Sequence, residues 1–252
     1  MIVFEALLPH NPLLLQTEGV EDTHDAVVAI SALLSQAEPD VVILITEHLS
    51  QHNKAFTILS NPAVTGSLKQ FGKVTEKKYI IDTTLASELA HSARHAHIPV
   101  QQVHAETLDY GSAIAAHLLG LDAPLLVIGT SQGTILEHAA CGEFMQEILQ
   151  RTNKRIAILI TGDCSHKHSV DTPVGFSENS EVFDTKFTTL IAERSISALA
   201  HLSQSADDAD ECVSRAAALG FGMIRKFPTD THVFAYEMLH GVGVLSALIF
   251  TA

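Results

Sequence analysis

Short runs of Val, Ile and Leu alternate along this chain with longer segments in which apolar positions recur at helical spacing. The apolar runs predict strands at residues 2–7, 41–46, 56–59, 78–81, 98–103, 125–129, 156–161 and 232–236. Several are almost continuously apolar, as expected for strands buried on both faces. The intervening segments predict helices at residues 21–37, 84–96, 111–119, 134–152, 180–202 and 208–225. This alternation predicts an α/β fold with a central, mostly parallel or mixed β-sheet and helices on both faces.

The composition is typical of one globular domain, which we assign to residues 1–252. Apolar residues make up 46% of the chain and charged residues 17%, so the chain is too apolar to be disordered. The longest apolar run falls short of the ~20 residues that span a bilayer. The first residues lack the basic start of a signal peptide. The three cysteines are unpatterned and do not suggest a disulfide framework, so we expect a cytoplasmic protein.

Charge and histidine content narrow the possible ligands. The formal net charge of −14 disfavours binding to nucleic acid or to an anionic membrane. No glycine-rich phosphate-binding motif opens a predicted helix. The 15 histidines are as numerous as lysine and arginine together. This excess favours metal or proton chemistry.

Chemically active side chains follow four of the predicted strands. They are, in chain order, His10, His48, Ser131, Asp163 and His166. In open α/β sheets, ligands bind outside the carboxyl ends of the strands. We therefore expect a metal site at one edge of the sheet. His10 lies in the segment PHNP, where two prolines stiffen the loop around it.

Two histidine-rich segments need separate interpretation. In TEHLSQHNKAF, His48 and His52 are four residues apart, but the residues between them do not match the zinc motif H-E-x-x-H. We interpret His52 as a surface loop residue. In GDCSHKH, His166 is suited to acid–base catalysis near neutral pH. We interpret Cys164 as small apolar filler rather than as a nucleophile.

A serine hydrolase is one alternative. The segment GTSQG has the form G-x-S-x-G and lies between a predicted strand and a predicted helix, the context of a nucleophile elbow. Ser131 would then be the nucleophile, and Asp208 with His232 or His240 could complete a triad. This function ranks third, because it leaves His10 and His48 without a role.

Read in order, several segments resemble the LigB-like superfamily of class III extradiol ring-cleavage dioxygenases and their Memo-type relatives. The segments are LLPHNPLLL, PDVVILITEHLSQHNKAFTI, TGSLKQFG, LDYGSAIAAHLL, ITGDCSHKH and VFAYEMLHGVGVLSALIF. They cover nearly the whole chain in the family's order. The resemblance implies the family's α/β fold and a mononuclear non-haem Fe(II) site.

The resemblance also implies roles for individual residues. His10 and His48 would ligate the iron, and His166 would be the acid–base residue, with Asp163 and Tyr110 beside it as further catalytic candidates. Tyr110 replaces a histidine of the family pattern; a tyrosine can donate a hydrogen bond but titrates near 10 rather than 6.5. Glu211, in DECVSRAAALGFG, is the expected carboxylate ligand.

The third ligand could be Glu211 or its neighbour Cys212. Val213 replaces a glycine of the family's motif in this segment, so the alignment of the motif could shift by a residue. A thiolate from Cys212 would favour zinc or copper over iron.

These residues predict an Fe(II)-dependent dioxygenase that opens a catechol-type aromatic ring with O₂. The two changed positions, Tyr110 and Val213, give weight to a second function: a Memo-like metal-binding protein that keeps the fold but does not cleave rings. The expected partners are a small aromatic substrate and O₂, with a homo-oligomer possible on this sequence.

Overall fold

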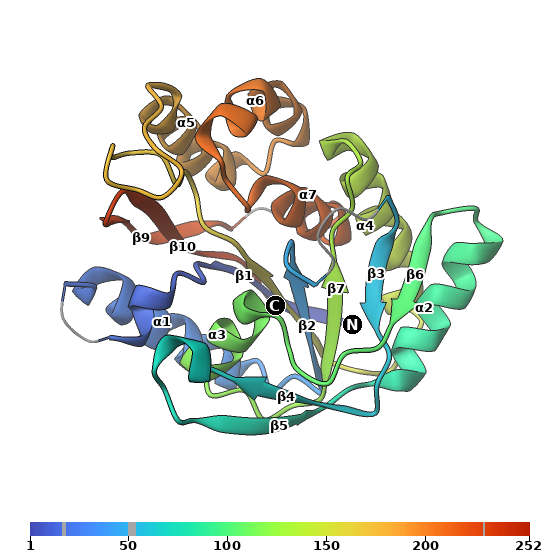
Figure 1. The fold of residues 1–252 in the computed structure, drawn as a ribbon. Helices are drawn as coiled ribbons and strands as arrows, with labels where there is room; N and C mark the ends of the chain where they lie inside the picture. The colour runs from blue at the N-terminus through green and yellow to red at the C-terminus, as the bar shows by residue number, and fades with distance from the viewer. Residues whose placement is uncertain (17–18, 50–53, 229) are drawn as a thin grey trace.

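The fold is built on a mixed sheet of eight strands in the order β6-β3-β7-β2-β8-β1-β10-β9 (Figure 1). The computed structural model describes residues 1–16, 19–49, 54–228 and 230–252. The strands of the sheet are β1 (Ile2–Leu8), β2 (Val41–Thr46), β3 (Phe56–Leu59), β6 (Val100–Val103), β7 (Leu125–Gly129), β8 (Ile156–Thr161), β9 (His232–Leu239) and β10 (Val242–Thr251). A separate antiparallel pair is formed by β4 (Ala63–Ser67) and β5 (Glu76–Ile80).

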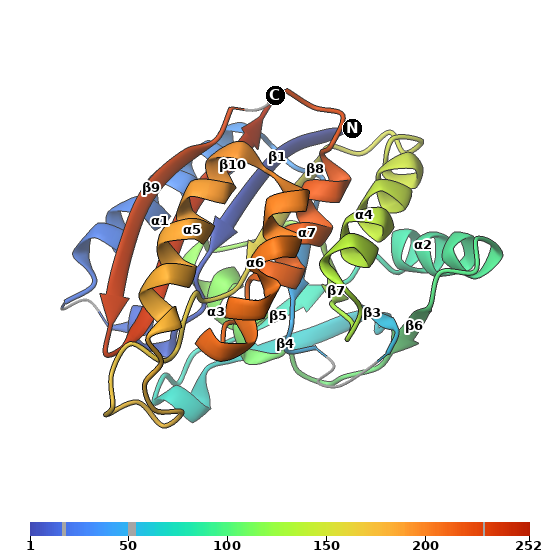
Figure 2. The same ribbon diagram turned by 90° about the horizontal axis from the view of Figure 1, so that it is seen from above.

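Helices cover both faces of the sheet (Figure 2). They are α1 (Glu21–Gln36), α2 (Thr83–His95), α3 (Tyr110–Leu118), α4 (Ile135–Leu149), α5 (Asn179–Glu193), α6 (Ile196–Ala209) and α7 (Ser214–Met223), with short 3-10 turns at Pro12–Leu15 and Lys69–Phe71. One apolar core joins the sheet to α2, α4, α5, α6 and α7, and another joins it to α1, α3 and the β4–β5 pair. Of the described helices, none is long and apolar enough to cross a membrane.

The four central strands β7, β2, β8 and β1 run parallel to one another, so their carboxyl ends lie at the same edge. Each is buried along its whole length, because apolar side chains point to both faces. The outer neighbours are antiparallel: β3 pairs with β7, and β10 pairs with β1 and β9. The loops that follow β1, β2 and β8 therefore meet at the edge where the sequence predicts a site.

The predicted α/β fold with a mixed sheet is confirmed, with three differences in the elements. The expected helix 180–202 is two helices, because Arg194 adopts a left-handed conformation (φ 48°) between α5 and α6. The Arg194 guanidinium donates to the carbonyl oxygen of Phe227 at 2.9 Å, which holds this break in place. Strands β4 and β10 were not predicted.

Candidate metal centre

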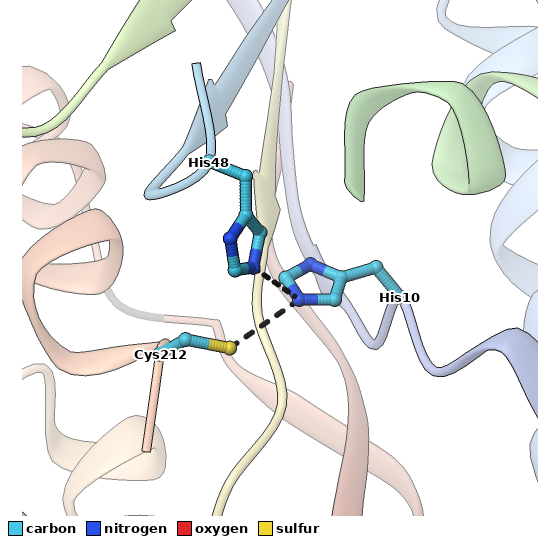
Figure 3. A group of neighbouring side chains, drawn as sticks. All are labelled: His10, His48 and Cys212. Atoms are coloured by element: carbon cyan, nitrogen blue, oxygen red, sulfur yellow. Dashed lines mark hydrogen bonds between the residues drawn. The ribbon is translucent and has the colours of Figure 1, made fainter. Parts of the chain in front are cut away.

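Three segments that are far apart in the sequence bring His10, His48 and Cys212 together (Figure 3). His10 follows β1, His48 follows β2, and Cys212 precedes α7. One ligand atom from each of the three side chains lies within 4.8 Å of the other two. The two imidazole Nε2 atoms are 3.0 Å apart, and the Cys212 Sγ is 3.3 Å from the His10 Nε2. We call these three residues the donor cluster.

Hydrogen bonds from the neighbouring backbone fix the donor cluster in place. The His10 N–H donates to Asp163 Oδ1 at 2.9 Å, and the Cys212 N–H donates to the Asp163 carbonyl oxygen at 3.2 Å. The His48 N–H donates to Thr46 Oγ1 at 3.0 Å. Asp163 therefore links two of the three ligand-bearing segments through one buried residue.

Two glycines allow the close packing around the cluster. A Cβ atom at Gly162 would lie 2.7 Å from the Cys212 carbonyl oxygen, and one at Gly111 would lie 2.9 Å from His10 Nδ1. Both distances are shorter than side chains tolerate, so only glycine fits at these positions. The sequence interpretation assigned no such role to Gly111, because a helical glycine signals close approach only once its neighbour is known.

Burial keeps both imidazoles neutral at physiological pH. It is the largest cause that lowers the pKa of His10 to about 3 and that of His48 to about 4, and the charges of neighbouring histidines contribute to both shifts. Neutral imidazole is the form that binds metal ions. Burial also raises the pKa of the Cys212 thiol, so a metal ion that binds the thiolate must displace a proton.

The donor cluster fits a transition-metal ion. Its donor set is two imidazole nitrogens and one sulfur, a combination found in zinc and copper sites. The His10 Nδ1 is buried and has no hydrogen-bond partner among the described residues. Nε2 of His10 contacts both other donor atoms although it carries only one hydrogen or one lone pair, so a hydrogen bond accounts for only one of the two contacts.

The three side chains predicted to be catalytic lie around the cluster. The Tyr110 hydroxyl is 2.8 Å from His48 Nε2, and its ring packs edge-on to His10. Asp163 is buried, and burial raises its pKa to about 6 although the charge of His166 opposes the shift. His166 Nδ1 bonds the carbonyl oxygen of Asp210, and the charge of His166 lowers the pKa of His10.

The predicted third ligand, Glu211, is not part of the donor cluster. Its Oε2 accepts hydrogen bonds from the backbone N–H groups of Val213 at 2.6 Å and Ser214 at 2.7 Å. These amides lie at the start of α7, where backbone donors have no partner within the helix. The carboxylate of Glu211 thus caps α7, and the structure brings Cys212 to the two histidines in its place.

A second carboxyl group, Glu47, lies beside Glu211. Burial and, second to it, the charge of Glu211 raise the pKa of Glu47 to about 8. The Arg215 guanidinium is 3.5 Å from Glu47 Oε2. The edge of the cluster therefore carries two adjacent carboxyl groups and one arginine.

The hydrolase alternative finds no triad in the described part of the chain. Ser131 Oγ accepts from the Gly133 N–H at 3.1 Å, and the Ser131 N–H donates to His138 Nε2 at 3.2 Å. Asp208 accepts from the side chain of Asn179, and His232 packs edge-on to Phe234 on β9. Ser131 is thus a turn residue.

Cys164 is fully buried in the core, as expected for apolar filler. His52 lies outside the described residues.

Comparisons with known proteins show which family the chain belongs to. A curated relative, Protein CA_C1420 of Clostridium acetobutylicum, is 20% identical over 257 residues, which cover 94% of this chain and 55% of the relative. The chain thus spans about half the length of that protein.

The fold is also similar to the crystal structure of uncharacterized protein JW3007 from Escherichia coli K12. The TM-score is 0.69 at 13% identity, covering 98% of this chain and 100% of the other. The family model described as the catalytic LigB subunit of aromatic ring-opening dioxygenase matches residues 5–246. The chain therefore belongs to the LigB family.

Proposed function

We propose that the protein is a Memo-like, metal-binding member of the LigB family that holds one zinc or copper ion on His10, His48 and Cys212. The position of the Cys212 sulfur, 3.3 Å from His10 Nε2, carries this proposal. Soft thiolate ligands favour zinc and copper, whereas non-haem Fe(II) oxygenases use two histidines and one carboxylate. The cluster has the two histidines, but its third donor is sulfur.

Three protein ligands would leave a coordination position for an exogenous molecule. When bound, the ion would supply a Lewis acid that polarises an oxygen atom in that position. The Tyr110 hydroxyl is 2.8 Å from the nitrogen through which His48 would bind the ion. Since that nitrogen has one lone pair, metal binding would free the Tyr110 hydroxyl to contact the bound molecule. His166, half-buried beside the cluster, could exchange protons with that molecule.

Ring cleavage of a catechol-type aromatic with O₂ and Fe(II) is the second candidate. It is supported by family membership and by the places of Asp163, His166 and Tyr110 around the cluster. A cytoplasmic location and a homo-oligomer stay predictions.

Metal analysis of anaerobically purified protein tests which residue is the third ligand. We expect zinc or copper in the unmodified protein and in Glu211→Gln, and loss of the metal in Cys212→Ala. Glu211→Gln is the matched control, because its amide oxygen can still cap α7 while its charge is gone. His10→Ala combined with His48→Ala gives the value for an emptied site.

The opposite pattern would overturn the proposal. Iron that survives in Cys212→Ala but is lost in Glu211→Gln would restore the carboxylate ligand. If such iron-loaded protein also formed yellow ring-cleavage products from a panel of catechols, the dioxygenase function would be established. If neither the unmodified protein nor any variant contained metal, both the zinc or copper site and the Fe(II) dioxygenase would be excluded.

A further inference from the structure

A cavity of about 840 Å³ lies between α5 and β9, and no member of the donor cluster lines it. Figure 1 shows the segment between β8 and α5 looping out beside β9, and residues of this segment line the cavity. The volume falls within the range of small-molecule sites. Three carboxylate side chains contribute to the lining, together with aromatic and hydroxyl groups, and no lysine or arginine of the described residues does.

The floor of the cavity is a buried hydrogen-bond network centred on Asp184. Its Oδ2 is 2.7 Å from His168 Nε2 and accepts from the Tyr236 hydroxyl at 2.6 Å, and its Oδ1 accepts from the Ser165 N–H at 2.9 Å. The side chains of His168 and Asp184 are 6% and 3% exposed. Gly243 is needed here, because a Cβ atom at that position would lie 2.0 Å from Asp184 Oδ2. The network is thus held rigidly.

Several polar groups that line the cavity already donate their hydrogens to acceptors of the protein itself. Since the Asp184 carboxylate accepts from His168 Nε2, Nδ1 would be the acceptor in the neutral form of the ring, and it has no hydrogen-bond partner in the described chain. The Tyr236 hydrogen also goes to Asp184. The Thr188 and Thr189 hydroxyls donate to backbone carbonyls one turn earlier on α5. What these groups offer to the cavity is lone pairs.

The charged and apolar side chains of the cavity wall also favour a cationic ligand. Glu178 and Glu181 line the cavity and are exposed. Phe176 and Met238 are 56% and 53% exposed and form its apolar part. An aromatic face attracts a cation through its quadrupole. A ligand that donates several hydrogen bonds, carries positive charge and has an apolar stem satisfies all of these groups.

We propose that the α5–β9 cavity is a second binding site, which takes a primary ammonium ion carried on a short apolar or aromatic stem. The ammonium group donates to His168 Nδ1 and to the carboxylates of Glu178 and Glu181. The stem packs on Phe176 and Met238. This site does not depend on the proposed function, because none of its groups belongs to the donor cluster.

Calorimetric titration of the full chain with three matched probes tests the proposal. Phenethylamine is the cation, 2-phenylethanol its neutral counterpart and phenylacetate its anionic one. Of the three probes, we expect only phenethylamine to show saturable binding. Added salt should weaken this binding, and removal of metal from the protein should not change it. Glu178→Gln combined with Glu181→Gln should weaken binding of the amine about fivefold, since exposed charge pairs contribute little each.

The control variant is Glu193→Gln, which removes an exposed carboxylate at the far end of the same helix. It should bind the amine as the unmodified protein does. Equal affinity for the alcohol and the amine, or unchanged affinity in the double variant, would overturn the ammonium site. Tighter binding of phenylacetate would show a protonated His168 and an anion site instead. Failure of all three probes to bind at millimolar concentration would also overturn the proposal.

Discussion

The donor cluster and the α5–β9 cavity are both built around a buried aspartate, but they arrange lone pairs differently. At the donor cluster, Asp163 binds backbone N–H groups, and the side chains of His10, His48 and Cys212 converge on one point. In the cavity, Asp184 collects the side-chain hydrogens, and lone pairs are spread over the wall. Convergent donors suit a metal ion, whereas dispersed acceptors suit a larger cation.

One short segment serves both regions. In ITGDCSHKH, Asp163 and His166 lie at the donor cluster, while His168 contributes to the floor of the cavity. The Ser165 N–H, between them, donates to Asp184. This segment therefore connects the donor cluster to the α5–β9 cavity through Asp184. Substitutions of Asp163 and Asp184 can be compared directly.

The largest expected effect on stability comes from Glu5, a buried carboxyl group to which no described residue donates a hydrogen bond. Burial raises the pKa of Glu5 from 4.5 to about 8, partly offset by the charge of Arg194. The folded state therefore keeps a proton that the unfolded chain releases. Its contribution to stability is fully present below about pH 4.5 and is lost as the pH rises through about 8.

We expect Glu5→Gln to remove this pH dependence. Between pH 5 and pH 9, the variant should gain roughly 3–5 kcal/mol of unfolding free energy relative to the unmodified protein. Urea unfolding at both pH values measures the change, and the exposed Glu88→Gln serves as control. A constant difference between Glu5→Gln and the unmodified protein would show that Glu5 is ionised in the folded state.

A smaller effect is expected at Asp184, which has three donors where Glu5 has none. Asp184→Asn should lower the free energy of unfolding by about 2 kcal/mol, because hydrogen bonds to a charged group contribute about 1.5–3 kcal/mol. It should also weaken phenethylamine binding while leaving the metal content unchanged. Denaturant unfolding and metal analysis of the same sample measure both. Loss of metal in Asp184→Asn would show that the two regions are coupled through Ser165.

The smallest effect is expected at Ser131, which lies at the same edge of the sheet but belongs to neither region. Ser131→Ala removes only the turn hydrogen bond from the Gly133 N–H, so it should cost less than about 1 kcal/mol. Metal content and amine binding should not change. Esterase activity in the unmodified protein that disappears in Ser131→Ala would bring the hydrolase function back.

The parallel strands at the centre of the sheet were predictable because they are apolar on both faces, which gives continuous apolar runs in the sequence. The long strand β10 was not predicted: it directly follows the β9 turn at His240 and Gly241, and its pairing with β1 joins residues almost a whole chain apart. Similarly, the break at Arg194 depends on carbonyl groups beyond α7. Such long-range contacts leave no local periodicity.

In the donor cluster, too, one part follows from local sequence patterns and another only from long-range contacts. That His10 and His48 lie at one edge of the sheet follows from the strands that precede them, because parallel strands end together. Which of Glu211 and Cys212 meets these histidines could not be read from the sequence, because the two residues are adjacent. The start of α7 decides it: the helix's unpaired N–H groups bind the Glu211 carboxylate, and the next side chain, that of Cys212, lies against His10.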